Sequence, residues 1–461
     1  MEPLEPLDAA MITAELLADP LHTAALLILS PPPEAGPDYV DELYRQALTD
    51  PADLDTRFRR HPHAGVDTAG LWLWRNDDRV DMRKHLRRCT LPAGTDRAGL
   101  WRLIGELHGE PLDRSRPMWL AYVIDGLADG AFAFYIKVHH SVIDGVAGLK
   151  MITDALTPDP TRRSMRPLYA ARHSTDESRW RSRGGIPNPL GLARDGLDLA
   201  RHVALGELST VVSSLRSRTA LPSFGAPYTR FNGRLGRERA VTGATWAKSR
   251  IRAIQQAAGV TGNDVVTTVV AGVLRAWLDA RGELPSLSLV AICPVTVRSR
   301  DGNGAEDGHG NLFGLQLCSL GTNLADPAKR LAHVHRVMAR AKGQVSSRGA
   351  NATTLLLAPS IVPTVLLPAL PVAPRLRRAY NVSLSNIPGP SSEMYWNGAR
   401  LEEIYPVSVA IDGQALNVTV CSYADRVAFG YVSGREVMPD IESVVPLTES
   451  ALTELEAAVG V

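Results

Sequence analysis

Cysteine is scarce in this chain, and its few copies are scattered. Four cysteines occur among 461 residues, and no two of them form a C-x-x-C pair (Cys89, Cys293, Cys318 and Cys421). Disulfide frameworks and structural zinc sites need closely spaced or paired cysteines, so neither is expected here. Thiols spread in this way fit a reducing compartment.

The chain also lacks an excess of charge of either sign. Fifty Lys and Arg residues face 49 Asp and Glu residues, which leaves a net charge of +1. A protein whose main ligand is nucleic acid needs a basic surplus to neutralise phosphates. We therefore expect no nucleic-acid partner.

No targeting or membrane-spanning segment stands out. The first 20 residues are acidic and have no basic stretch followed by an apolar run, so they do not read as a signal peptide. The charge-free stretch 349–374 contains five prolines, each of which removes a helix donor. Instead of a membrane span, this stretch predicts buried irregular packing or a patch that touches a lipid surface.

Two common catalytic signatures are missing. No G-x-S-x-G elbow follows a strand-like run, so a hydrolase-type serine is not indicated. The glycine-rich stretch 302–314 lacks the G-K-[ST] ending of a phosphate-binding loop and the strand-turn-helix context of a dinucleotide site. It is predicted to be an ordinary loop.

Length and hydrophobic pattern predict an α/β protein with two lobes. A chain of 461 residues, 45% of them hydrophobic, exceeds one ordinary core. Helix-like and strand-like patterns alternate in residues 1–156 and again in 231–461, which favours one lobe in each half. Between them, 157–230 reads as an arginine-rich linker followed by a long crossing helix. Ligand sites often lie between such lobes.

The pattern predicts individual elements as well. Helical spacing of apolar residues is seen in 11–20, 38–50, 95–109, 145–156, 245–259, 261–282 and 326–344. Thr261 is a plausible N-cap for its helix. Strand-like composition is seen in 22–32, 119–140, 287–298, 380–385 and 416–434.

The stretch "HHSVIDG" (139–145) closes a strand-like run and carries the chemistry of most interest. Successive strand side chains alternate between faces, so His140 continues the apolar row that ends at Val138, and His139 points the other way. Two adjacent strand histidines do not easily chelate one ion, and no metal is expected. A desolvated imidazole at His140 would stay neutral and ready to accept a proton. A satisfied core histidine followed by an ordinary turn is the structural alternative.

Two further polar features accompany the histidines. Asp144 could orient the turn or pair with an arginine; Arg298, which ends the strand-like "PVTVR", is either that partner or a surface residue. In "SLSNIPGP" (383–390) a strand-like run is broken by a rigid reversal. This reversal is either a structural corner or a source of hydrogen-bond donors for an oxyanion.

Taken together, several blocks resemble one family. "HHSVIDG" looks like the HHxxxDG motif of the superfamily of condensation domains and chloramphenicol-acetyltransferase-like enzymes. The other blocks are similar, in the same order, to those of the bacterial wax ester synthase/acyl-CoA:diacylglycerol acyltransferase family: "PLDAAMITAE", "PLDRSRPMW", "GNDVV", "PVTVR", "GNLFG", "SNIPGP" and "YPVSVAIDGQALNVTVCSY". They extend from about Pro6 to Asp440 and so cover nearly the whole chain.

Two departures from the family pattern are small. The chain has "PMW" (117–119) where the family commonly has PLW, and Met11 stands where an aromatic residue is usual. Both concern the preference for acyl chain or alcohol more than the reaction.

The resemblance implies a role for each matching residue. His140 resembles the general base, and His139, Asp144 and Gly145 complete its motif, the first two as structural supports. Substrate-binding roles are implied for residues in the other blocks: Glu15, Trp119, Asn263, Asp264, Arg298, Ser385, Asn386 and Gly389.

The same resemblance implies the fold and the reaction. It predicts two chloramphenicol-acetyltransferase-like lobes with the active site in a tunnel between them. The expected reaction moves a long-chain acyl group from acyl-CoA to the hydroxyl of diacylglycerol or a fatty alcohol, without an acyl-enzyme. Acyl-CoA would be a co-substrate, and no cofactor is expected.

Other readings stay open at this point. The donor could be an acyl group on a carrier protein, as in condensation domains, or the chain could be a catalytically silent lipid-binding protein of the same fold. The expected location is the cytoplasm, with peripheral contact to a membrane or lipid-droplet surface.

Overall fold

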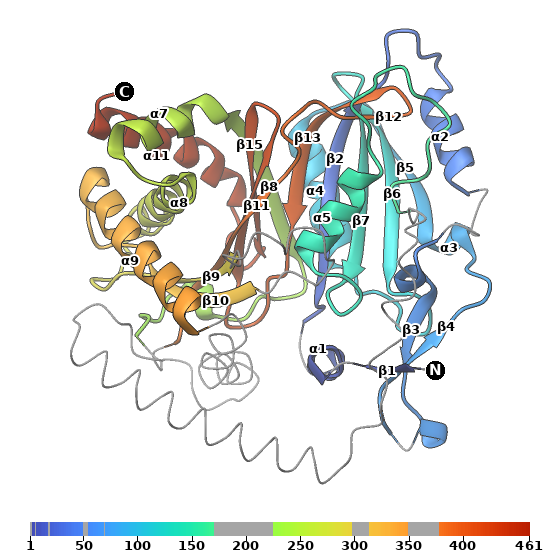
Figure 1. The fold of residues 1–461 in the computed structure, drawn as a ribbon, viewed down its shortest axis with the longest axis horizontal. Coiled ribbons are helices and arrows are strands. Elements are labelled where there is room, and N and C mark those ends of the chain that lie inside the picture. Colours follow the sequence, from blue (N-terminus) through green and yellow to red (C-terminus); the bar gives the residue numbers. More distant parts are fainter. Residues whose placement is uncertain are drawn as a thin grey trace.

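The structure, a computed structural model, has two lobes built around separate β-sheets (Figure 1). It describes residues 2–4, 6–16, 19–48, 54–68, 70–169, 225–296, 313–348 and 378–461. The alternation of helix and strand predicted from the sequence is confirmed in both halves of the chain. The arginine-rich stretch beyond Tyr169, the loop 302–312, Arg298 and the charge-free stretch 349–374 lie outside the described residues.

The N-terminal lobe is centred on a six-stranded sheet with the order β12-β13-β2-β7-β6-β5. Its strands are β2 (His22–Ser30), β5 (Leu86–Thr95), β6 (Trp119–Leu127), β7 (Phe132–His139), β12 (Tyr395–Trp396) and β13 (Ala399–Val407). Central strand β7 is buried along its whole length, which explains its near-continuous apolar sequence. Helices α2 (Tyr39–Leu48), α4 (Arg97–Gly109) and α5 (Gly145–Asp154) pack on this sheet.

A small sheet extends the lower end of this lobe in Figure 1. It joins β1 (Glu2–Pro3), β4 (Leu73–Asn76) and β3 (Arg60–His63) in that order. Helix α1 (Pro6–Glu15) follows β1 and lies at the same end of the lobe (Figure 1). The N-terminal segment is thereby folded against the β3–β4 hairpin.

The C-terminal lobe has its own six-stranded sheet, in the order β10-β9-β11-β14-β15-β8. Its strands are β8 (Arg239–Ala247), β9 (Val290–Thr296), β10 (Phe313–Ser319), β11 (Val382–Pro388), β14 (Leu416–Tyr423) and β15 (Arg426–Gly434). Four helices pack together on the outer side of this sheet (Figure 1): α7 (Lys248–Ala258), α8 (Gly262–Asp279), α9 (Pro327–Arg348) and α11 (Val444–Val459).

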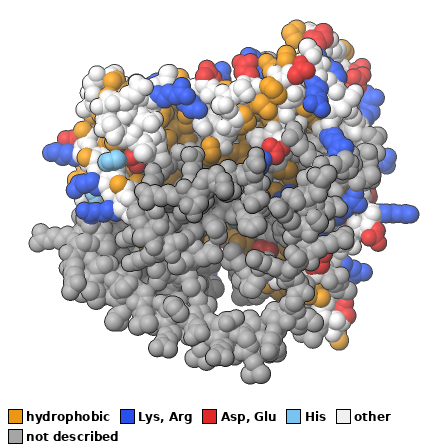
Figure 2. All heavy atoms as spheres, in the orientation of Figure 1, with side chains coloured by type: hydrophobic (Ala, Val, Ile, Leu, Met, Phe, Trp, Pro, Cys, Tyr) orange, Lys and Arg blue, Asp and Glu red, His pale blue; other side chains and the backbone are white. Residues whose placement is uncertain are grey.

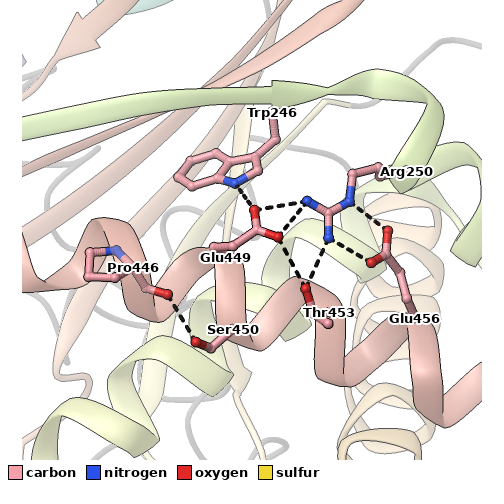
Figure 3. A network of polar contacts seen from close by, with 7 residues as sticks. All are labelled: Trp246, Arg250, Pro446, Glu449, Ser450, Thr453 and Glu456. Carbon is pink, nitrogen blue, oxygen red and sulfur yellow. Dashed lines mark hydrogen bonds and ion pairs between the residues drawn. The ribbon is translucent and has the colours of Figure 1, made fainter.

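A network of charged side chains fastens the last helix to this group (Figure 3). The Arg250 guanidinium on α7 donates to Glu456 at 2.7 and 2.6 Å and to Glu449 at 2.9 and 2.8 Å, both glutamates being on α11. Trp246 donates its indole N–H to the same Glu449 carboxylate at 2.7 Å. A guanidinium that binds two carboxylates stabilises the packing of two helices more than an isolated surface ion pair does.

The two lobes share strands as well as a boundary. β13 comes from the second half of the sequence, yet it pairs antiparallel with β2 in the N-terminal sheet, from Arg400–Ser30 to Val407–Ala24. It also contacts β14 and β15 of the C-terminal lobe. The backbones meet so closely that a Cβ at Gly430 would lie 2.5 Å from the Pro406 carbonyl oxygen, so only glycine fits there.

Charged groups also join the lobes beside this strand. The buried Arg239 guanidinium on β8 pairs with the Asp19 carboxylate at 2.8 Å, and Asp19 lies in the loop before β2. The same carboxylate accepts the backbone N–H of Asp412 at 2.9 Å. Burial and the nearby Asp19 carboxylate raise the pKa of Asp412.

Figure 2 shows basic side chains at the left edge of the described surface and a mixture of basic and acidic side chains at its upper right. Of the helices in the described ranges, none is by itself long and apolar enough to cross a bilayer. Helices α7 and α8 meet the composition requirement only as a pair, and they are bent by 106° where they join.

Most of the predicted elements are confirmed, with shifted ends. The predicted helix 245–259 is wrong at its start, because residues up to Ala247 continue β8 and pair with β15. The C-terminal lobe is predicted to span 231–461. In the structure β12 and β13, which lie in this range, join the sheet of the N-terminal lobe instead. Thr261 does cap α8, accepting the backbone N–H of Asp264 at 3.3 Å.

Candidate functional site

The histidine pair lies where β7 ends and the chain turns toward α5. His139 is the last residue of β7 and pairs with His22, the first residue of β2. The backbone N–H of His139 donates to the Met118 carbonyl at 3.0 Å, and that of His140 donates to the Leu21 carbonyl at 2.9 Å. The backbone of both histidines is therefore fixed by neighbouring segments.

The His139 ring is fully buried and fixed on both sides. Its Nδ1 atom accepts the backbone N–H of Ser141 at 3.2 Å and lies 2.7 Å from the Ser141 hydroxyl. With Nδ1 acting as acceptor, we infer that Nε2 carries the proton. That Nε2 atom lies 3.4 Å from Oε2 of Glu15, so the ring is enclosed between Ser141 and Glu15. The role of His139 as a structural support stays a prediction.

Glu15 is a buried carboxylate that touches three different segments. Besides facing His139, its Oε1 atom accepts the backbone N–H of Leu21 at 3.0 Å, and its Oε2 atom lies 3.2 Å from Nε of Arg114. Burial would raise the pKa of Glu15, but His139, the Leu21 N–H and Arg114 together outweigh it and lower the pKa. The side chain is therefore an anion at neutral pH.

The same glutamate also bears on His140. The backbone N–H of Leu21 donates to the Glu15 carboxylate, and the Leu21 carbonyl accepts the backbone N–H of His140. Glu15 thus holds the His139 ring directly and the His140 backbone through one intervening residue. The family resemblance implies a substrate-binding role for Glu15. Its contacts in the structure are with residues that position the two histidines.

His140 is the half-buried member of the pair. Burial lowers its pKa below 6.5, with the Asp144 carboxylate acting in the opposite direction and His139 adding to the lowering. The imidazole is therefore neutral at pH 7 and able to accept a proton. This combination of partial exposure and lowered pKa is what a general base requires.

Asp144 is the N-cap residue of α5 and caps the helix with its side chain. Its carboxylate accepts the backbone N–H groups of Val146 and Ala147 at 2.9 and 2.8 Å. These bonds hold the turn that leads from β7 into α5, and the role of Asp144 as a support for the histidines stays a prediction. Gly145 begins the helix, and a Cβ there would meet only the Thr23 hydroxyl, at 3.7 Å.

A buried lysine lies on the His139 face of β7. Lys137 donates from Nζ to the carbonyls of Leu107 and Glu110, at 2.5 and 2.6 Å, where α4 ends. Burial lowers the pKa of Lys137 to about 8. Because a cation at a helix C-terminus satisfies its free carbonyls, Lys137 holds α4 against the sheet behind the histidine pair.

A second group of predicted residues lies in the C-terminal lobe. Asn263 is in the first turn of α8, and its side-chain oxygen accepts from Nδ2 of Asn386 on β11 at 3.2 Å. Asn386 is exposed and Asn263 half-buried, so the amide groups of the pair are accessible to solvent. The structure thus brings together two blocks that lie far apart in the sequence.

Asp264, next to Asn263, is almost fully buried. Its Oδ2 atom accepts the backbone N–H of Thr261 and faces Nδ1 of His335 on α9, each at 2.9 Å. Its Oδ1 atom is buried with no hydrogen-bond partner among the described residues. These contacts make Asp264 a helix cap that ties α8 to α9.

The "SNIPGP" block ends β11 beside β14. Ser385 is half-buried and pairs in register with Thr419. Gly389 donates its N–H to the Ser422 carbonyl at 2.8 Å, and a Cβ there would lie 2.4 Å from that same oxygen. This block is a tight backbone corner, and Gly389 is the residue that allows it.

Trp119 begins β6 and is packed inside the N-terminal lobe. Its ring stacks on His85 at a centroid distance of 4.6 Å and meets Phe58 edge-on at 5.2 Å, and its N–H donates to the Phe58 carbonyl at 3.0 Å. The contacts described for Trp119 are those of a core residue. Arg298, proposed as a partner of Asp144, lies outside the described residues.

Three residues of the site were missed by sequence reasoning. Arg114, Ser141 and Leu21 all contact the histidine pair or Glu15. Arg114 and Ser141 lie inside blocks that had already been singled out, so their position was the available signal. Leu21 acts only through its backbone, and no property of a leucine side chain would reveal that.

Comparison with known sequences agrees with the motif blocks. Residues 4–266 match the model of the wax ester synthase/diacylglycerol acyltransferase catalytic domain, and residues 309–456 match the model of its C-terminal domain. A putative diacylglycerol O-acyltransferase of Mycobacterium tuberculosis is 38% identical over 99% of this chain and its own full length. The probable diacylglycerol O-acyltransferase tgs2 of the same species is 34% identical over the full length of both.

Comparison with solved structures gives the same answer for the fold. The wax ester synthase/diacylglycerol acyltransferase from Marinobacter aquaeolei VT8 superposes with a TM-score of 0.79 at 31% identity, over all of both chains. The first condensation domain of the calcium-dependent antibiotic synthetase superposes with a TM-score of 0.60 at 15% identity, over 99% of this chain and 96% of its own. The second likeness concerns the two-lobed fold alone.

Replacing the buried carboxylate should reveal its contribution to stability. Because the folded state lowers the pKa of Glu15, its ionised form stabilises the fold above the ordinary value of 4.5, and this stabilisation disappears as pH falls through the lowered pKa. At pH 7 we expect Glu15→Gln to reduce the free energy of unfolding by about 1–3 kcal/mol. The difference from the wild type should stay constant from pH 7 to about pH 5 and shrink only as pH falls below 4.5, which unfolding curves recorded down to about pH 3 check. Glu106→Gln, at an exposed position of α4, is the control, and an equal loss in both variants would contradict this role.

The helix cap at Asp144 can be separated from its charge. Asp144→Ala removes the acceptor of two backbone N–H groups and should cost about 1 kcal/mol, whereas Asn is itself a good N-cap and should cost little. Denaturant titrations of both variants check this difference. Since the Asp144 carboxylate raises the pKa of His140, Asp144→Asn should move the acidic limb of the pH–activity profile to lower pH. Equal stability of the Ala and Asn variants would argue against the capping role.

Proposed function

This chain belongs to the wax ester synthase/diacylglycerol acyltransferase family and is an O-acyltransferase; on that basis we propose that it moves a long-chain acyl group from acyl-CoA to the hydroxyl of diacylglycerol or a fatty alcohol. The observation that carries the proposal is His140. It is half-buried, its pKa is lowered, and it lies in the motif "HHSVIDG" at the end of a buried strand.

The chemistry needs such a base. The hydroxyl of an alcohol has a pKa far above 7, so its attack on a thioester is slow unless a neighbouring group takes the proton. General-base catalysis of this kind contributes about 10²–10⁴-fold. Neutral His140 takes the hydroxyl proton while the alcohol oxygen attacks the thioester carbonyl. The C–S bond then breaks, and the His140 imidazolium returns its proton to the departing thiolate of CoA.

The transfer is direct. An acyl-enzyme needs a nucleophile activated by a base, and the charged or titratable side chains that act on His140 are those of Asp144 and His139, neither of which is such a nucleophile. Ser141 is the nearest hydroxyl in the motif, but it is buried and engaged with Nδ1 of His139. The acyl group therefore passes from sulfur to the alcohol oxygen in one transfer.

The asparagine pair is the proposed contact for the substrate in the C-terminal lobe. Asn263 and Asn386 are joined by one hydrogen bond, which leaves amide donors and acceptors free for a polar ligand. Amides of this kind suit the pantetheine arm of acyl-CoA, which is itself made of amides. The substrates then meet between the lobes, with the base on one side and the asparagine pair on the other.

Contact with a lipid surface is part of the proposal. Diacylglycerol and long-chain alcohols reside in membranes and droplets, so an enzyme that uses them gains from binding there. The protein is proposed to reside in the cytoplasm and to attach to such a surface peripherally. No cofactor enters the reaction.

A carrier-protein donor is the second reading of the same fold. Two condensation domains that superpose on this chain are 15% and 13% identical to it, and this likeness concerns the fold only. The family models instead match the wax ester synthase/diacylglycerol acyltransferase domains over most of the chain. We therefore favour CoA as the carrier of the acyl group.

The proposed reaction is tested by product analysis. Labelled palmitoyl-CoA is supplied with hexadecanol in one reaction and with diacylglycerol in another, and the lipids are resolved by thin-layer chromatography. Labelled wax ester, triacylglycerol or both are expected. Product formed only when the palmitoyl group is presented on a phosphopantetheine-loaded carrier protein would favour the second reading, and no product with any donor would favour a silent lipid-binding protein.

The base is tested by substitution and by pH. We expect His140→Ala to lower the turnover number by about 10²–10⁴-fold, because a positioned base is lost. For the wild type, kcat/KM should fall as pH drops through a pKa below 6.5, where His140 becomes protonated and can no longer accept a proton. Near-normal turnover of the Ala variant would remove His140 from the mechanism. Thermal unfolding of the same variant controls for loss of fold.

A further inference from the structure

The described residues expose few large hydrophobic side chains, and the three most exposed belong to two segments at one end of the N-terminal lobe, α1 and the β3–β4 hairpin. They are Val66 at 102% relative exposure, Leu71 at 67% and Leu16 at 54%. Val66 and Leu71 are in the turn between β3 and β4, and Leu16 follows the last residue of α1. Single exposed hydrophobic residues are common, but a group of this kind indicates a contact surface.

Hydrogen bonds join these two elements into one surface. The Trp72 indole N–H donates to the Thr13 hydroxyl at 3.1 Å, and the backbone N–H of Leu16 donates to the Thr13 carbonyl at 3.1 Å. Figure 1 draws α1 and the β3–β4 hairpin at the same end of the N-terminal lobe. We call Leu16, Val66, Leu71 and half-buried Trp72 the apolar tip.

The hairpin turn is built to hold its apolar side chains outward. The backbone N–H of Gly70 donates to the Gly65 carbonyl at 2.9 Å, and the buried Thr68 hydroxyl bonds both the N–H and the carbonyl of Gly65, at 3.0 and 3.1 Å. Held in this way, Val66 stays fully exposed instead of folding back on the lobe.

The lack of basic residues around the apolar tip limits which kinds of partner it can bind. Residues 6–16 and 63–73 contain no Lys or Arg, and the acidic Asp67 is paired with His63 at 2.9 Å. A surface that binds anionic lipids uses clustered basic residues, which are missing from these two segments. A stable protein interface buries roughly 800 Å² on each partner, more than a projecting turn with a few apolar side chains supplies. Trp72, bonded through its N–H and half-exposed, is typical of a residue at a boundary between lipid and water.

From these observations we propose that the apolar tip inserts into an electrically neutral lipid surface and so docks the enzyme on the phase that holds its alcohol substrate. Its position supports this role, because Leu16 directly follows Glu15, whose carboxylate faces His139. Docking through the apolar tip brings the lipid next to the histidine pair. This inference rests on the proposed function, since it names the surface from which the alcohol is drawn.

Binding to vesicles tests the proposal. Wild-type protein is sedimented with vesicles of phosphatidylcholine and diacylglycerol, beside the variants Val66→Asp and Leu71→Asp. A carboxylate is costly to place in lipid, so each variant should lower the partition coefficient at least about tenfold. Leu287→Asp is the matched control, because Leu287 is an exposed leucine of the C-terminal lobe, at 44%. Its binding should stay within about twofold of the wild type.

A second measurement separates this proposal from the proposed reaction. Transfer of the palmitoyl group from CoA to a short, water-soluble alcohol needs no lipid surface, so all three variants should perform it at the wild-type rate. Normal vesicle binding by the tip variants, or wild-type binding that requires anionic lipid, would overturn the proposal while leaving the reaction intact. A tip variant that changes the oligomeric state but still binds vesicles would assign the surface to a second copy of the chain instead.

Discussion

The site depends on one dehydrated anion. A carboxylate removed from water is stable only when cations and hydrogen-bond donors replace its hydration, and Glu15 obtains these from Arg114, Leu21 and His139. Because those partners belong to three different segments, satisfying one charge fixes the end of α1, the start of β2 and the end of β7 relative to one another. The position of His140 follows, since its backbone is bonded to Leu21.

The two histidines of the pair differ in burial, and this difference separates their proposed roles. His139 is enclosed and bonded at Nδ1, whereas His140 remains half-exposed and neutral. Alternation along a strand predicts that the two rings face different surroundings, but β7 ends at His139, and His140 is the first residue of the turn that follows. A metal clamp made of both rings would need them on one side. The geometry instead suits a base supported by a neighbour that does not react.

Much of the fold follows from hydrophobic periodicity, because the pattern of a helix or strand is local. The buried strand β7, the capped helix α8 and the hairpin of β14 and β15 are of this kind. The pairing of β13 with β2 could not be predicted from the sequence, because the residues of a strand do not indicate which distant strand it will pair with. Nor could the contact of Glu15 with His139: motif blocks singled out both residues, but their contact exists only after two separate segments fold together.

The exchange of β12 and β13 limits how this protein can be divided. Each lobe looks like a separate unit, and the arginine-rich linker looks like a natural place to cut and recombine chains from different relatives. A cut there would pair a foreign β13 with β2. Moving residues 395–407 with the N-terminal lobe keeps that pairing but places Pro406 against a foreign β15, where the Gly430 position admits no side chain. The portion that must travel together is the N-terminal lobe with residues 395–407, so a hybrid enzyme that exchanges whole lobes has to be joined at three places in the chain instead of one.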